Sequence, residues 1–132
     1  MLKTNKYAIA FICWMLFVTW ASLFSFSDVD LPSFKIPHLD KVVHFTFYFV
    51  AFVLGVFFFR ERTKGEIQLR KALGSILFGV IVFGIIIEVI QQRFTLSRAG
   101  DIFDAISNSI GALVGAWVMR FLFSKKRGLK WK

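Results

Sequence analysis

The sequence is poor in the residues that build soluble domains and metal sites. Its single cysteine, Cys13, excludes an intrachain disulfide, and no cysteines and histidines have the spacing of a zinc site. Only 19% of the 132 residues are charged, eight of them acidic, and there are two prolines. This composition is too apolar for an ordinary soluble domain. Cys13 lies in an apolar run and is expected to pack as a small hydrophobic residue.

Apolar residues dominate the composition of the chain. They make up 57% of the chain and include 18 phenylalanines. The apolar runs predict an all-α membrane bundle of four transmembrane helices, because about 20 apolar residues cross a bilayer as a helix. The predicted helices cover residues 7–26, 41–59, 72–90 and 102–123, in one domain of residues 1–132. The third run is rich in β-branched residues, but its length and continuity favour a helix in lipid.

The first apolar run has an alternative interpretation as a cleaved signal peptide. Small residues follow its core at a plausible position for cleavage, namely Ala21, Ser22, Ser25 and Ser27. The run is longer than the roughly 7 to 15 residues of a signal-peptide core, which favours a retained helix. Cleavage would leave the topology of the remaining chain unchanged.

Basic residues lie in short blocks beside the apolar runs. The net charge is +9, and thirteen of the 17 lysines and arginines fall in the N-terminus, the 60–71 loop and the C-terminal segment. Such an asymmetry is typical of membrane topology signals rather than of nucleic-acid binding. It predicts that both termini are cytoplasmic and that nucleic acid is not a partner.

Two polar clusters then fall on the outer side of the membrane. One begins the second helix, and the other spans the end of the third helix and the start of the fourth. Spacings of three and four place the polar residues of each helix on one face. The predicted binding residues are Asp40, Lys41, His44, Tyr48, Glu88, Gln92, Arg98, Asp101, Asp104 and Asn108.

Small residues share these helical faces, as in Gly111-x-x-x-Gly115, and small residues let helices approach closely in lipid. A carboxylate in mid-membrane costs about 2.5 to 3.5 kcal/mol, so Glu88 and Asp104 should face protein or water. Arg93 and Arg98 are the expected partners of these acids. The faces therefore predict one outward-facing polar pocket. In a purely structural alternative, Asp40 and Asp101 cap helices and Arg98 is only a counter-ion.

The combined motifs resemble the VanZ-like family of small bacterial membrane proteins. They are Asp40-Lys41-x-x-His44-Phe45, Glu88-x-x-Gln91-Gln92-x-Phe94 and Arg98-x-x-Asp101-x-x-Asp104-x-x-x-Asn108-x-x-Gly111-x-x-x-Gly115. The resemblance covers the second to fourth helices. It implies a multi-pass protein of the bacterial cytoplasmic membrane with a link to the cell envelope. The family takes its name from a protein linked to teicoplanin resistance, but the resemblance alone does not make this chain a resistance factor.

Three functions fit these residues. The first is a non-enzymatic envelope protein that binds a lipid-linked precursor or a lipoglycopeptide, with Arg98 gripping phosphate or carboxylate. The second is a membrane enzyme acting on a lipid-linked phosphate or ester, with His44, Asp40, Glu88 and Asp104 as candidate catalytic residues. The third is a transporter or channel subunit, which the lack of a deeper ionisable layer disfavours.

These residues do not decide between a binding function and a catalytic one. No hydrolytic signature such as Gly-x-Ser-x-Gly is present. No metal or cofactor is expected, except that the acids would hold Mg²⁺ in the enzyme alternative. The expected partners are membrane lipids and the lipid-linked or glycopeptide ligand. A homodimer is compatible with Ser75-x-x-x-Gly79, a pattern too common to decide it.

Overall fold

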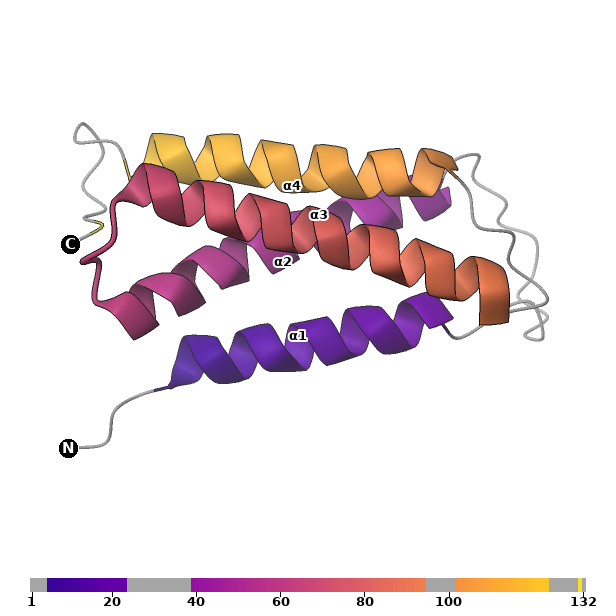
Figure 1. The fold of residues 1–132 in the computed structure, drawn as a ribbon, viewed down its shortest axis with the longest axis horizontal. Coiled ribbons are helices and arrows are strands. Elements are labelled where there is room, and N and C mark those ends of the chain that lie inside the picture. The colour runs from indigo at the N-terminus through magenta and orange to yellow at the C-terminus, as the bar shows by residue number, and fades with distance from the viewer. Residues whose placement is uncertain (1–4, 24–38, 95–101, 124–130, 132) are drawn as a thin grey trace.

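A computed structural model describes residues 5–23, 39–94, 102–123 and 131. These residues form four helices and no strand (Figure 1): α1 (Lys6–Leu23), α2 (Leu39–Thr63), α3 (Leu69–Phe94) and α4 (Ile102–Leu122). All four are long and apolar enough to cross a membrane. Lipid offers the backbone no hydrogen-bond partners, so apolar runs of this length satisfy their own groups as helices. The prediction of an all-α bundle of four such helices is confirmed.

Two helices extend beyond the predicted apolar segments. α2 continues to Thr63 and α3 begins at Leu69, so the predicted 60–71 loop was too long. α3 also continues to Phe94, four residues beyond the end predicted at residue 90. Hydropathy marks where lipid ends, whereas Arg, Glu and Gln favour helix and extend it into water. The last three residues of the predicted 7–26 helix lie outside the described residues.

The connection from α2 to α3 begins with two residues in the left-handed conformation. Lys64 has φ 55° and Gly65 has φ 74°. Such residues end helices, and glycine adopts this conformation without a side-chain clash. α2 therefore ends immediately before these two residues.

Small residues bring α2, α3 and α4 into close contact. A Cβ atom placed on Gly111 of α4 would lie 3.1 Å from the backbone Cα and C of Phe45 in α2. A Cβ on Gly115 would lie 3.1 Å from the Phe52 side chain. The helix faces predicted to pack through small residues do so.

α1 packs on α2 and α3, on the side of the bundle away from α4 (Figure 1). Its first turn is held by Glu61 of α2, whose carboxylate accepts hydrogen bonds from the Tyr7 N–H at 3.2 Å and the Ala8 N–H at 3.4 Å. A negative charge favours the positive N-terminal end of a helix dipole. Near the other end, the Gln91 side chain donates to the Ser22 carbonyl. The helix is therefore fixed to its neighbours at both ends.

The two ends of the bundle differ in charge. The start of α1, the end of α2, the start of α3 and the end of α4 meet at one end, named here the basic end (Figure 1). Its described basic residues are Lys6, Arg60, Arg62, Lys64, Arg70, Lys71 and Arg120. Trp131 is also held there, because its Nε1 donates to the Ile67 carbonyl at 2.7 Å. The opposite end, named the site end, carries the start of α2, the end of α3 and the start of α4.

Candidate functional site

Five polar side chains from three helices converge at the site end. α2 and α4 begin there and α3 ends there, so residues distant in sequence meet at one depth. The spacing from Lys41 to His44 and from Asp104 to Asn108 puts each pair on one face of its helix. The polar cluster consists of Lys41, His44, Glu88, Asp104 and Asn108.

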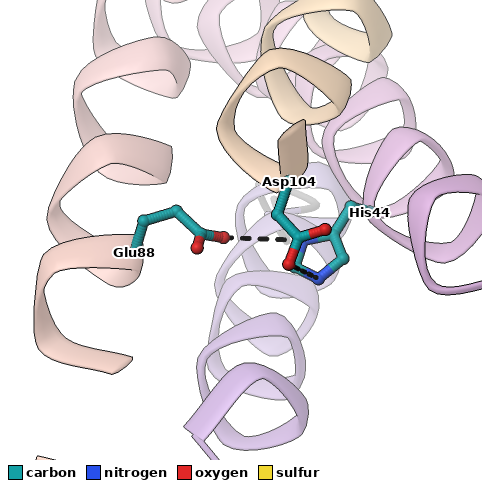
Figure 2. A group of neighbouring side chains, drawn as sticks. All are labelled: His44, Glu88 and Asp104. Carbon is teal, nitrogen blue, oxygen red and sulfur yellow. Dashed lines mark ion pairs between the residues drawn. The ribbon is translucent and has the colours of Figure 1, made fainter. Parts of the chain in front are cut away.

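Asp104 lies between two nitrogen-bearing side chains of α2. Lys41 Nζ is 2.7 Å from Asp104 Oδ1, which makes a short ion pair. His44 Nε2 lies 3.7 Å from Asp104 Oδ2 (Figure 2). The outer part of the cluster is therefore a carboxylate held between an ammonium group and an imidazole ring.

Asn108 connects His44 to Glu88 in the inner part of the cluster. His44 Nδ1 lies 3.0 Å from Asn108 Oδ1, and Asn108 Nδ2 donates to Glu88 Oε1 at 3.5 Å. Because an amide oxygen only accepts hydrogen bonds, this contact places a proton on Nδ1 of the ring. Glu88 Oε1 also lies 3.8 Å from His44 Nδ1 (Figure 2). One chain of contacts thus runs from Lys41 through Asp104, His44 and Asn108 to Glu88.

The inner residues of this chain of contacts are more buried than Lys41 and Asp104. The side chains of Lys41 and Asp104 are 23% and 14% exposed, whereas those of His44 and Glu88 are 6% and 10% exposed, and Asn108 as a whole residue is 2% exposed. Burying a charge is costly unless other groups pair with it. The inner residues therefore depend on the contacts described above, and Lys41 and Asp104 form the accessible edge.

Tyr48 lies beneath the cluster, one turn further along α2 than His44. Its ring packs against Phe83, with centroids 6.3 Å apart, and against Gly84, on which a Cβ would lie 3.0 Å from Tyr48 Cε1. The Tyr48 hydroxyl is buried and has no hydrogen-bond partner among the described residues. Tyr48 thus separates the polar cluster from the apolar core.

The other predicted site residues lie elsewhere. Gln92 is exposed, and the neighbouring Gln91 is the buried glutamine of this region, contacting Ser22 of α1. Arg98, Asp101 and the side chain of Asp40 lie outside the described residues. The structure does not test the roles predicted for these three residues.

The described ion pair of Asp104 is one that the sequence analysis did not predict. Arg93 was an expected partner, but its side chain is exposed, and Lys41 pairs with Asp104 instead. Lys41 stands one turn before His44, and this i, i+3 spacing is the signal that could have identified it. Gln91 was also missed as a contact to α1, although its spacing of three from Glu88 gave a similar signal.

A shallow hollow of about 250 Å³ lies beside the accessible edge of the cluster. Lys41, Val42 and Phe45 of α2 and Ser107 and Ile110 of α4 line it. Its walls are largely apolar, and Lys41 connects it to the polar cluster through Asp104. The arrangement combines a cationic group with an apolar surface on helices that span the membrane.

A family model described as VanZ/LLP1 matches residues 3–123, which include all four helices and every residue of the polar cluster. The chain belongs to the VanZ/LLP1 family. The resemblance seen in the sequence motifs is therefore confirmed, and this VanZ/LLP1 protein is a multi-pass membrane protein. Comparison with curated proteins and with solved structures found no match. The function of this VanZ/LLP1 protein is therefore argued from its own residues.

Proposed function

We propose that this VanZ/LLP1 protein binds an amphiphilic or lipid-linked molecule of the bacterial envelope at its site end. The observation that carries the proposal is the convergence of the polar cluster beside an apolar hollow. Ionisable groups within membrane-spanning helices are costly and mark functional sites. The basic end supports an orientation in the cytoplasmic membrane with the site end outward, because cytoplasmic segments carry the excess of Lys and Arg.

The hollow supports an amphiphile as the ligand. Lys41 offers an ammonium group with several donors to a phosphate or carboxylate. Val42 and Ile110 are exposed apolar residues on the outer faces of α2 and α4, where lipid chains would lie. A headgroup on Lys41 would therefore place an attached chain against Phe45 and these two residues.

Filling the hollow tests this proposal without removing a charge. Ser107→Phe introduces a ring into the hollow and removes only a hydroxyl that bonds the Phe103 carbonyl of its own helix. We expect it to weaken binding of a fluorescent polyprenyl phosphate by about tenfold, equivalent to about 1.4 kcal/mol. The measurement is an equilibrium titration of the protein in nanodiscs.

Ile106→Phe is the matched control, because Ile106 is exposed on α4 and does not line the hollow. It should bind the probe as the unaltered protein does. Equal affinity in both variants, or no binding by the unaltered protein, would contradict the proposal for this ligand. Teicoplanin is the second probe. Binding of teicoplanin alone would assign the site to a lipoglycopeptide and support a link to glycopeptide resistance.

A second candidate function is a membrane enzyme acting on a lipid-linked phosphate or ester. One observation favours it: ligand atoms of His44, Glu88 and Asp104 all lie within 4.8 Å of one another. An imidazole with two carboxylates is a donor set that divalent metals accept. However, these side chains already contact Lys41 and Asn108, so metal binding would have to displace those contacts.

Metal titration and product release test this second candidate together. We expect an enzyme of this kind to bind Mn²⁺ or Zn²⁺ in calorimetry and to release phosphate or fatty acid from a panel of envelope lipids. His44→Gln should weaken metal binding by about tenfold or more, as expected for loss of one ligand. If metal neither binds nor promotes release of either product, the enzyme candidate fails, while amphiphile binding remains testable with the probes above.

A further inference from the structure

A groove at the basic end is separate from the polar cluster. It lies between the first turns of α3 and the last turns of α4 and has a volume of about 380 Å³. Small-molecule sites in proteins occupy roughly 300 to 1,000 Å³. The lining combines apolar residues with two arginines, and its principal members are Arg70, Leu73, Gly74, Leu77, Trp117 and Arg120.

The two arginines give the groove a positive charge. One comes from α3 and one from α4, both are exposed, and no acidic residue lines the groove. Within the described part of the chain, no hydrogen bond or ion pair engages either guanidinium group. Guanidinium groups bind phosphate oxygens through paired donors, which a single ammonium group does not offer. Arg70 and Arg120 are therefore suited to hold one phosphate between them.

The floor of the groove is left open by a glycine. Apart from its chain neighbours and the backbone of its own helix, a Cβ on Gly74 would meet nothing within 4 Å. Leu73 and Leu77 flank this space on α3, and Trp117, which is 70% exposed, borders it on α4. Tryptophan is enriched where membrane meets water, at the depth of lipid headgroups. The groove thus joins a charged mouth to an apolar channel on the outer surface of the bundle.

We infer that this groove binds an anionic phospholipid of the surrounding bilayer, with the phosphate on Arg70 and Arg120 and one acyl chain along Gly74. Basic pockets between transmembrane helices on the cytoplasmic side bind anionic headgroups in this way. A second copy of the chain fits less well, because a two-fold symmetric contact would bring the same arginines of both copies together.

The test measures phospholipid binding by native mass spectrometry of the purified protein. The probes are phosphatidylglycerol and phosphatidylcholine with identical acyl chains. We expect phosphatidylglycerol to bind about tenfold more tightly, because both lipids carry the phosphate but the choline cation of phosphatidylcholine is repelled by the two arginines. Gly74→Leu fills the channel and should weaken binding of both lipids, whereas Arg70→Gln with Arg120→Gln removes the charge and should remove the preference.

Two matched controls should keep the preference. Gly79→Leu adds the same side chain to another glycine of α3 whose Cβ would meet nothing within 4 Å, and Arg62→Gln removes a charge from the basic end outside the groove. Loss of the preference in these controls, or its absence in the unaltered protein, overturns the inference. Binding of glycerol phosphate as tightly as of the whole lipid would assign the arginines to a soluble anion. A change from dimer to monomer on Gly74→Leu would assign the groove to a second copy, and either result overturns the lipid assignment.

Discussion

Gly111→Ala is expected to lower the free energy of unfolding by about 3 kcal/mol, near the upper end of the cost of adding one methyl group to a packed interior. The new Cβ would meet the backbone Cα and C of Phe45 at 3.1 Å and would come closer still to its carbonyl oxygen. A side chain can rotate away from such a clash, but a helical backbone cannot. α2 and α4 must therefore move apart, and the contact between them is lost along several turns.

Substitutions at two other glycines serve as comparisons for Gly111→Ala. The atoms nearest to a Cβ on Gly115 belong to the Phe52 side chain at 3.1 Å and not to a backbone, so the cost of Gly115→Ala should be smaller. Gly79→Ala meets nothing within 4 Å and should be neutral or slightly stabilising, because alanine favours helix over glycine. The measurement is thermal or denaturant unfolding in a fixed detergent. Equal midpoints for Gly111→Ala and Gly79→Ala would show that α2 and α4 do not pack as described.

The same contact determines the geometry of the polar cluster. Gly111 stands three residues after Asn108 on α4, and Phe45 directly follows His44 on α2. The separation of these helices therefore sets the 3.0 Å contact between His44 and Asn108 and the 2.7 Å ion pair between Lys41 and Asp104. A larger residue at Gly111 should weaken any ligand binding at the site end as well as the fold.

The sequence periodicity predicted much of the helix arrangement, because that arrangement follows from the lengths of the apolar runs and of the connections between them. Four apolar runs of membrane length fix the helices, and three connections fix which ends meet, so His44, Glu88 and Asp104 had to lie at one depth. Which side chains pair with each other depends on the rotation of each helix about its axis. Sequence spacing determines that rotation only to within about one residue. Gln92 was therefore predicted as the site residue, although Gln91 is the buried glutamine. Arg93 was predicted to pair with the acids, although Lys41 pairs with Asp104. Helix ends were also misplaced, since polar residues continue a helix beyond the lipid.

Lys41→Met is expected to cost about 2 kcal/mol of folding free energy, because it removes one partner of a partly buried ion pair and leaves the Asp104 carboxylate without that contact. Asp104 is only 14% exposed and lies 2.7 Å from Lys41 Nζ. After the substitution, His44 is the residue of the cluster whose nitrogen could replace Lys41, and its Nε2 lies 3.7 Å from Asp104 Oδ2. That distance is too long for a direct hydrogen bond, so the carboxylate loses its strongest contact.

A double-mutant cycle separates the ion pair from other effects of the substitution. Asp104→Asn in the Lys41→Met background removes the second charge at almost constant volume and should recover most of the lost free energy. Lys71→Met, an exposed lysine at the basic end, is the control and should change the free energy by less than about 0.5 kcal/mol. Additive costs in the cycle would show that the two side chains do not interact.

The cycle also distinguishes a structural ion pair from a functional one. If the double variant folds as well as the unaltered protein, the pair is not required for stability, since apolar or neutral replacements of ion pairs are often tolerated. Its presence beside the hollow then needs a reason other than stability, and ligand binding supplies one. The double variant should accordingly bind the polyprenyl phosphate probe at least about tenfold more weakly, because the cationic group at the edge of the hollow is gone. Unchanged probe binding in a well-folded double variant would show that the ligand does not bind at Lys41.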